Sequence, residues 1–405
     1  MEIEAVTPRV LMLCKGLPPL EIGGGVESFS EQVARAYLRR GIEVHMIAPT
    51  SGPPGWQTRT YPDGSIAIFN TCVDGQLVTA MRMARAVGKL TRRKSFDFVH
   101  STTWRPALTT AVVRRRMPLV VSVHGREIVS VPPPMRPLMW QILRRAALVV
   151  AVSSSTRKRA AAHLGPFVNV SQWIVANNGL SFDPGELDSG ESSRSTRDGE
   201  SRTVRILTLA RLVERKNIQG CIDALEALSR SGFTDFEYRI AGTGPLEATL
   251  RGAVERAGLA HLVKFLGYVP DAAIPDLYRW ADIFLHPQVE ADGGRDFEGF
   301  GLTIADAMSF GCLAIVGSGA GPSEFVMDGE TGFVVDGNNA SQLEETLRRV
   351  LQSPNNYGKI AAAGCSYVTR ELSWDKHVGT VLDALDGTDS CAHRRCAGRQ
   401  LKHDV

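Results

Sequence analysis

Short apolar runs alternate with segments of helical periodicity along both halves of this 405-residue chain. Such runs are typical of buried parallel strands, and the amphipathic segments, such as residues 26–41 and 107–116, are typical of the helices between them. The alternation predicts an α/β fold with two doubly wound, Rossmann-like domains facing across a cleft. The predicted strands are residues 9–14, 44–48, 65–70, 96–100, 118–123 and 148–153, then 204–210, 237–242, 263–267, 282–287 and 313–317.

A stretch rich in glycine, serine and charge separates the two halves. Such a composition is typical of a linker or a long surface loop. Two domains also suit the length, because one hydrophobic core rarely serves more than about 250–300 residues. We predict an N-terminal domain over 1–185, a linker over 186–202, a C-terminal domain over 203–370, a helix over 371–386 that returns to the N-terminal domain, and a disordered tail over 387–405.

The chain has the composition of a cytoplasmic protein. No apolar run approaches the roughly 20 residues that a membrane helix needs, and the first ten residues lack the apolar segment of a signal peptide. The seven cysteines are scattered, with neither CxxC nor Cys/His ligand spacing. This pattern argues against a disulfide framework and a zinc site, so we expect no bound metal.

The charge is distributed unevenly, although the net value is only +3. Residues 1–185 contain 23 Lys and Arg against 11 Asp and Glu, whereas residues 186–405 contain 23 against 32. A basic half indicates an anionic partner such as nucleic acid, a lipid headgroup or a phosphorylated acceptor, or simply a solvated surface.

Glycine-rich loops follow two of the predicted strands. Gly24 and Gly25 precede a helix in the first half, and Gly244 lies in the loop AGTGPLE of the second half. Glycine lets a backbone approach an anion closely, and a helix N-terminus adds unpaired N–H groups. In the motif LARLVERKN, Arg211 and Lys216 offer a guanidinium fork and a point charge, a pair suited to two phosphates of one ligand.

The segment FEGFGLTIADAM combines two acids with such a loop. The predicted helix begins near Leu302, so N–H groups around Gly299, Phe300 and Gly301 can face an anion. Asp306 lies about one turn inside the helix, where it can accept hydrogen bonds from a diol, and Glu298 can reach sugar hydroxyls. A phosphate flanked by two hydroxylated groups describes a nucleotide sugar.

These motifs, in this order and spacing, resemble the retaining GT-B glycosyltransferases with a Glu-x7-Glu motif. This group includes bacterial phosphatidylinositol mannosyltransferases, sucrose-type synthases and many polysaccharide and glycolipid glycosyltransferases. The resemblance spans about residues 9 to 385, rests mainly on ARLVERKN, AGTGPLEATL, FEGFGLTIADAMSFG and SGAGPSEFVMDGETGFVV, and implies the GT-B fold.

The resemblance implies roles for individual residues. Arg211 and Lys216 would hold the donor diphosphate, with the backbone from Gly299 to Leu302 as its cradle. Glu298 would contact the transferred sugar. His124, at the end of a predicted strand, would face the same sugar. Asp306 stands where the family usually has a second glutamate for the ribose hydroxyls, and its shorter side chain affects donor affinity.

The implied reaction moves a hexose from a UDP- or GDP-type sugar to a hydroxyl acceptor, which is a glycolipid, a polysaccharide or a small molecule, with retention of anomeric configuration. Cations and N–H groups would stabilise the charge that develops on the leaving diphosphate. The chain contains no D-x-D tripeptide, so a divalent metal is not required by this interpretation. The catalytic residues would be His124, Glu298, Arg211 and Lys216, and the acceptor would bind the N-terminal domain.

The segment 81–94, MRMARAVGKLTRRK, interleaves cations with apolar residues at helical spacing. Such a helix is compatible with an anionic membrane surface, at about 1 kcal/mol for each cation near the surface. The hypothesis is a peripheral enzyme on the inner face of the cell membrane with a lipid-linked acceptor. The candidate membrane-facing residues are Arg82, Arg85, Lys89, Arg92, Arg93 and Lys94.

Three other classes stay open. A sugar-nucleotide 2-epimerase shares the two-domain fold and would convert donor without an acceptor. A nicotinamide dehydrogenase would need a tighter G-x-G-x-x-G loop than the one at Gly24 and Gly25. A nucleic-acid binder could use the basic half, but no known recognition motif accompanies it, so we expect no nucleic acid.

Overall fold

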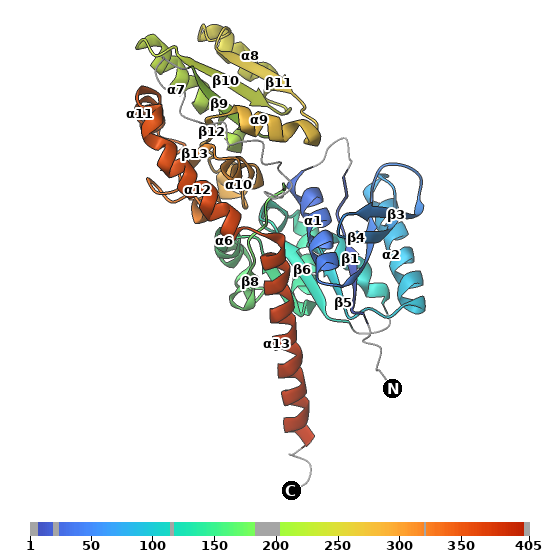
Figure 1. Cartoon of the computed structure of the whole chain (residues 1–405). Coiled ribbons are helices and arrows are strands. Elements are labelled where there is room, and N and C mark those ends of the chain that lie inside the picture. The colour runs from blue at the N-terminus through green and yellow to red at the C-terminus, as the bar shows by residue number, and fades with distance from the viewer. Residues whose placement is uncertain (1–6, 19–23, 114–116, 183–202, 320, 401–405) are drawn as a thin grey trace. The chain divides into compact units, whose positions relative to one another are not determined.

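The computed structural model describes residues 7–18, 24–113, 117–182, 203–319 and 321–400. The chain divides into two compact units, Met1–Gly179 with Ser373–Val405, and Leu180–Leu372 (Figure 1). We call these the N-terminal and the C-terminal unit. The predicted linker, 186–202, lies outside the described residues.

The N-terminal unit is built on an eight-stranded sheet in the order β3-β4-β2-β1-β5-β6-β7-β8. β3 runs antiparallel to β4, and every other neighbouring pair is parallel. The central strands are buried along their whole length, as expected for a sheet covered by helices on both faces. The strands are β1 Arg9–Leu13, β2 Glu43–Ala48, β3 Gly55–Tyr61, β4 Gly64–Asn70, β5 Phe98–Ser101, β6 Leu119–Val123, β7 Leu148–Ala151 and β8 Ile174–Val175.

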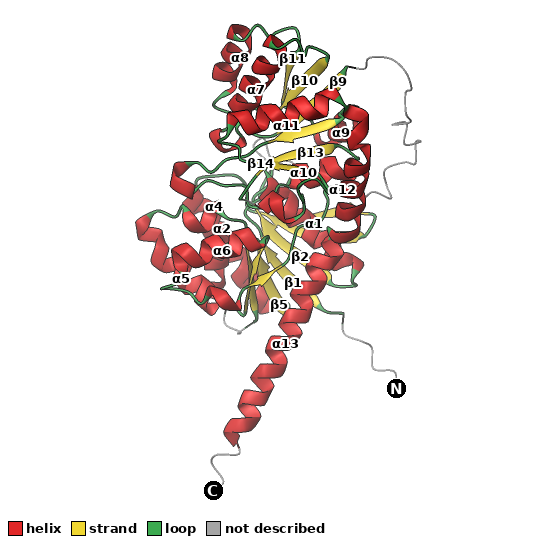
Figure 2. Cartoon of the chain, turned by 90° about the vertical axis from the view of Figure 1, so that its left-hand side faces the viewer, coloured by secondary structure: helices red, strands yellow, loops and turns green. Residues whose placement is uncertain are grey.

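Helices connect these strands and flank the sheet (Figure 2). The helices are α1 Gly25–Arg39, α2 Gln76–Arg93, α3 Trp104–Ala107, α4 Arg126–Val129, α5 Arg136–Arg145, α6 Ser154–Leu164 and α13 Trp374–Gln400. The C-terminal helix α13 packs on α1, where Trp374 meets the Phe29 ring edge-on at 5.5 Å between centroids. Arg39 forms an ion pair of 3.1 Å with Asp375, and Arg40 donates to the Asp375 carbonyl at 2.7 Å.

The C-terminal unit contains a six-stranded, fully parallel sheet in the order β11-β10-β9-β12-β13-β14. On one face of this sheet the core is an apolar cluster to which every second strand residue contributes, with Tyr238, Phe236 and Leu225 fully enclosed. The strands are β9 Val204–Leu209, β10 Phe236–Ala241, β11 Val263–Gly267, β12 Ile283–His286, β13 Leu313–Gly317 and β14 Phe333–Val335. The helices are α7 Ile218–Arg230, α8 Glu247–Arg256, α9 Ile274–Trp280, α10 Leu302–Ser309, α11 Ala340–Gln352 and α12 Gly358–Glu371.

The sheet topology confirms the predicted fold class of two Rossmann-like, doubly wound sheets. In the C-terminal unit the strand order reverses direction between β9 and β12, which are neighbours in the sheet. In doubly wound sheets, ligands bind beyond the carboxyl ends of the strands at this switch point. The loops after β9 and β12 are therefore the first place to search for a site.

Several predicted elements differ from the structure. Strands β3, β8 and β14 were not predicted, because β3 alternates polar and half-buried residues and the other two are very short. Residues 107–116 were predicted as a helix, but Leu108–Val112 form a 3-10 turn, since the β-branched threonines and valines there disfavour an α-helix. The disordered tail expected from residue 387 is wrong over 387–400: no proline interrupts this stretch, and α13 continues to Gln400.

Candidate active site

The loop after β9 places two cations at the switch point of the C-terminal sheet. Glu214–Lys216 form a 3-10 turn that ends at Asn217, whose backbone is left-handed with φ 50°. Asparagine tolerates this conformation better than most residues. The Asn217 amide donates to the carbonyls of Pro287 at 3.1 Å and Gly337 at 2.8 Å. These bonds fix the turn against the loop after β12.

Lys216 lies at the centre of a polar network that is almost closed to solvent. Its ammonium group donates to the carboxylate of Glu298 and, at 3.2 Å, to Nε2 of His286. The Arg215 guanidinium approaches the same Glu298 oxygen at 3.8 Å and Asp296 at 3.7 Å. We call these five residues, Arg215, Lys216, His286, Asp296 and Glu298, the Lys216 network.

The Lys216 network is held from behind by a second row of hydrogen bonds. Because His286 accepts at Nε2 from the lysine, it is neutral and donates from Nδ1 to Gln288 Oε1 at 3.1 Å. The Gln288 amide in turn donates to the Gly317 carbonyl at 2.7 Å and accepts from its N–H at 3.0 Å. A chain of bonds therefore runs from β13 through β12 to the ammonium group and sets its position.

Electrostatics keep the network charged in spite of its burial. Burial opposes ionisation of Glu298, but Lys216 and Arg215 outweigh it and lower the pKa of the carboxyl to about 2. Burial also lowers the pKa of Lys216, an effect that Glu298 opposes. Burial and the lysine charge lower the pKa of His286 to about 4. Near neutral pH the network thus contains the carboxylate of Glu298 and a neutral imidazole at His286.

A helix N-terminus lies directly after this acid. Helix α10 begins at Leu302, as predicted, with Gly301 before it at φ 93°. A side chain at Gly301 would also come within 2.8 Å of Pro322, so only glycine suits this position. The Phe300 ring is buried against Phe325, with centroids 5.2 Å apart. The loop from Gly299 to Leu302 therefore presents its backbone, at the positive end of the helix dipole, rather than its side chains.

The other predicted donor-binding residues occupy different settings. Arg211 follows β9 and is exposed, and within the described part of the chain its side chain has no ion pair. Gly244 packs so closely that a Cβ would lie 2.5 Å from the Leu212 carbonyl oxygen. Asp306 lies in α10, is 3% exposed, and accepts the Ser181 N–H at 2.7 Å. Burial raises the pKa of Asp306 to about 7.

His124 lies in the N-terminal unit at the carboxyl end of β6, as predicted. Its Nε2 donates to the Thr102 carbonyl at 2.9 Å, and its backbone N–H donates to Glu127 at 2.5 Å. The Phe29 ring meets the imidazole edge-on at 4.6 Å. Burial lowers the pKa of His124, an effect that Glu127 and the Thr102 carbonyl oppose.

Gly24 and Gly25 lie at the start of α1, with Gly24 as the N-cap. The buried Glu27 carboxylate folds back so closely that a Cβ on Gly24 would come within 3.3 Å of it. Lys15, just after β1, forms a 3.2 Å ion pair with Glu27. The sequence analysis did not predict this ion pair. The signal was available, because Lys15 follows a strand and Glu27 lies at the start of a helix, and the same placement led to the prediction of Gly24 and Gly25.

Sequence reasoning also missed Arg215, His286 and Asp296 of the Lys216 network. His286 ends a strand that was predicted correctly, so its position alone could have suggested it. Arg215 is next to Lys216 in the sequence, but the prediction paired Lys216 with Arg211 and gave Arg215 no role. Within the described residues, no group of three or more His, Cys, Asp or Glu side chains has the arrangement of a metal site.

Two family models match the chain. The model described as "Glycosyl transferases group 1" matches residues 193–365, and "Glycosyltransferase Family 4" matches residues 23–183. Together the two matches span most of the chain. The first contains the Lys216 network, and the second contains His124.

Named relatives agree with these models. A GDP-mannose-dependent alpha-(1-6)-phosphatidylinositol monomannoside mannosyltransferase of Mycobacterium tuberculosis is 29% identical over 390 residues, which is 94% of this chain and 99% of the relative. The amylovoran biosynthesis glycosyltransferase AmsK of Erwinia amylovora is 31% identical over 182 residues, 45% of this chain and 44% of the relative.

The fold is shared with a sucrose-phosphate synthase from Thermosynechococcus elongatus, at 18% identity and a TM-score of 0.73, covering 96% of this chain and all of the synthase. Sequence matches in both halves and the architecture thus lead to one conclusion. The chain belongs to the group 1 glycosyltransferases with the GT-B fold.

Proposed function

We propose that this glycosyltransferase moves mannose from GDP-mannose to a hydroxyl of a glycolipid acceptor, with retention of anomeric configuration and without a required metal ion. The choice of donor and acceptor follows the names of relatives that match nearly the whole chain, which are GDP-mannose-dependent and act on a phosphatidylinositol mannoside. The more general donor is any UDP- or GDP-type sugar, and the more general acceptor is a polysaccharide or a small molecule.

The main support is the Lys216 network beside the N-terminus of α10. The preorganised ammonium group, the Arg211 guanidinium and the backbone of Gly299 to Leu302 would surround the diphosphate. Negative charge grows on this group as the bond to the sugar breaks, so fixed donors stabilise the transition state more than the ground state. Two side-chain cations would supply the charge that a metal ion supplies elsewhere.

The remaining residues would position the sugar and the ribose. Glu298, held ionised by Lys216 and Arg215, would accept from sugar hydroxyls, and the His124 imidazole would face the transferred sugar. Asp306, whose carboxylate accepts the Ser181 N–H, would also accept from a ribose hydroxyl. In this proposal the N-terminal unit binds the acceptor.

Binding and product analysis test this function. GDP-mannose, UDP-glucose and ADP-glucose are added separately to the intact protein, and the rise in unfolding temperature identifies a ligand that prefers the native state. Transfer to a phosphatidylinositol mannoside is then followed by mass spectrometry and NMR, with and without EDTA. Failure of every nucleoside diphosphate sugar to bind the folded chain would remove the proposal.

A sugar-nucleotide epimerase remains the alternative on this fold. It would release an epimer of the donor sugar in the absence of any acceptor, so the same NMR assay distinguishes the two. The relatives named above are transferases by name, and they give the epimerase no support.

We further propose that the enzyme acts at an anionic membrane surface through the basic face of α2. No helix among the described residues has the length and hydropathy needed to cross a bilayer. Flotation with liposomes that contain or lack anionic lipid tests the association. Equal absence of the protein from both liposome fractions would contradict it.

A further inference from the structure

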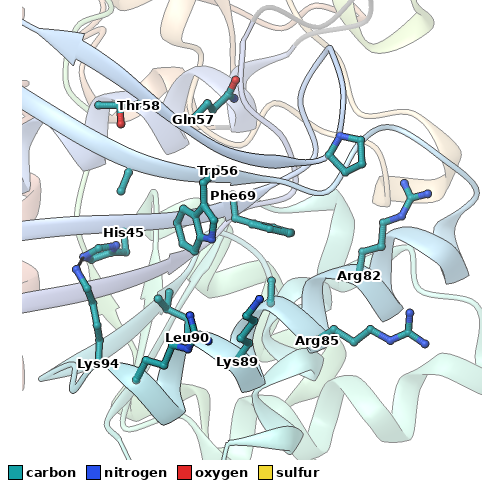
Figure 3. A pocket seen from close by; sticks show the side chains of 14 residues that line it. His45, Trp56, Gln57, Thr58, Phe69, Arg82, Arg85, Lys89, Leu90 and Lys94 are labelled. Atoms are coloured by element: carbon teal, nitrogen blue, oxygen red, sulfur yellow. Dashed lines mark hydrogen bonds between the residues drawn. The ribbon is translucent and has the colours of Figure 1, made fainter.

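The N-terminal unit contains a cavity of about 780 Å³ between helix α2 and strands β2, β3 and β4 (Figure 3). We call it the α2 pocket. None of its lining residues is acidic. The residues that line it include His45, Trp56, Phe69, Arg85, Lys89 and Arg93.

One wall of the α2 pocket is apolar and aromatic. Trp56 and Phe69 are paired across the antiparallel strands β3 and β4, with ring centroids 5.3 Å apart. Lys89 and Leu90 rise from α2 toward these rings (Figure 3). Trp56 is 51% exposed although it lines a cavity. Contact with an apolar or planar group would be favourable here, because it would remove apolar surface of the indole from water.

The opposite wall carries three cations without ion-pair partners. Arg85, Lys89 and Arg93 are four residues apart on α2, so they share one helix face. Each is exposed, and none has a salt bridge among the described residues. At the two ends of this row the cations are neutralised, because Arg82 pairs with Asp74 and Lys94 pairs with Glu43 at 3.3 Å.

The buried polar groups of the walls are incompletely satisfied. His45 is only 4% exposed, and its Nε2 contacts Glu43 at 2.6 Å, but its Nδ1 has no hydrogen bond among the described residues. The Gln57 amide nitrogen is also buried without an acceptor among the described residues, but Gln57 alternates with Trp56 along β3, so its side chain lies on the opposite face of the strand from the indole (Figure 3). Buried polar atoms without partners are rare in folded proteins, and those near a pocket often meet a bound ligand or water.

We propose that the α2 pocket binds one amphiphilic phosphate ester, with the phosphate on Arg85, Lys89 and Arg93 and the apolar part against Trp56 and Phe69. The pocket volume is typical of small-molecule sites. The ligand site is separate from the predicted donor residues, which lie in the C-terminal unit apart from His124, Gly24 and Gly25. Two sources supply this chemistry: a membrane phospholipid, or a soluble aromatic phosphate.

The test titrates the full-length protein by calorimetry with four probes. Dihexanoyl phosphatidic acid below its micelle concentration represents the lipid, and phenyl phosphate represents the soluble ester. Inorganic phosphate lacks the apolar part, and dihexanoyl phosphatidylcholine lacks the net charge. We expect saturable binding of at least one ester, and the tighter of the two identifies the source.

Variants then locate the site. Replacing Arg85, Lys89 and Arg93 by alanine together should weaken binding roughly tenfold or more, because a charge-assisted contact is lost at each position. Trp56→Ala should weaken it as well. Arg92→Ala is the matched control, since Arg92 is on the same helix but does not line the pocket. Lys89→Glu is a second variant that should weaken binding of the ester. The unfolding temperature and GDP-mannose binding verify that each variant is folded.

Three results would overturn the proposal: neither ester binds, inorganic phosphate binds as tightly as both esters, or the triple variant binds like the unmodified protein. If the unmodified protein did not bind GDP-mannose, that result would instead count against the proposed function. The two failures are therefore distinguishable.

Discussion

Lys216 in the C-terminal unit and Lys89 in the N-terminal unit are both cations in basic clusters, but their surroundings differ. Lys216 is enclosed, bonded to an acid and to a neutral histidine, and fixed by a chain of hydrogen bonds. Lys89 is exposed on a helix face between two other cations without ion pairs. The first cluster is preorganised and electrostatically balanced, whereas the second is an uncompensated positive surface.

This difference has a physical consequence for stability and for binding. A buried cation is tolerated only when an acid compensates for its desolvation, so removing one partner is costly. An exposed cation retains its hydration and adds little to folding. Substitutions in the Lys216 network should therefore affect folding and catalysis together, whereas substitutions in the α2 pocket should affect binding alone.

The largest effect is expected for Lys216→Met. Transfer activity should fall by about 10²–10³-fold, the usual result of removing one preorganised donor. The variant should also unfold at a lower temperature, because Glu298 would remain buried with only the more distant Arg215 as partner. Activity is measured as mannose transfer, and stability by thermal unfolding.

The double variant Lys216→Met with Glu298→Gln is the control for this interpretation. It should regain much of the lost stability but no activity, because it removes the unpaired charge together with the catalytic groups. If the single variant were as stable as the unmodified protein, the compensation described for this network would be incorrect.

Arg211→Ala should lower the affinity for the donor without changing the stability of the fold. Because Arg211 is exposed and has no ion pair among the described residues, its removal should leave the unfolding temperature unchanged. Affinity for GDP-mannose should decrease by roughly tenfold, as expected for one charged contact with a phosphate. Calorimetric titration of the donor measures this change, and unaltered affinity would exclude Arg211 from the diphosphate site.

Asp306→Asn should change how stability depends on pH. The pKa of Asp306 is about 7 in the fold against an ordinary 3.8, so its contribution to stability is complete below pH 3.8 and is lost as the pH rises through 7. Asparagine cannot ionise and can still accept the Ser181 N–H. The variant should therefore unfold at a higher temperature than the unmodified protein at pH 8, and the difference should shrink at pH 5.

Glu298→Gln should change the pH dependence of stability in the opposite direction to Asp306→Asn. The pKa of Glu298 is lowered to about 2 from 4.5, so its contribution is present above pH 4.5 and is lost as the pH falls toward 2. This variant should be less stable than the unmodified protein at neutral pH. Parallel pH profiles for the two variants would contradict both assignments.

The smallest effect is expected in the α2 pocket. Arg85, Lys89 and Arg93 repel one another at i, i+4 spacing, by about 0.2–0.5 kcal/mol for each pair. Their combined replacement by alanine should leave the unfolding temperature unchanged or slightly higher, and the increase should be larger at low salt. A marked decrease would show that these cations have partners in the folded chain.

The sequence by itself determined the fold class and the position of the loops that carry the site. Eleven predicted strands lie where the structure places strands, because continuous apolar runs are a strong local signal for buried parallel sheet. The start of α10 at Leu302 was also predicted, because Gly299 and Gly301 come directly before the helical pattern and mark the end of the loop. Strand β3 gave no such signal, because an edge strand buries only part of each residue.

Tertiary structure alone decided which side chains meet. His286 and Glu298 are separated from Lys216 by 70 and 82 residues, and only the adjacency of β9 and β12 brings them together. The α2 pocket likewise exists only because β3, which the sequence did not reveal, places Trp56 opposite the helix. Local patterns report whether a residue is buried, whereas long-range sheet pairing decides its neighbours, and the charge of each site depends on those neighbours.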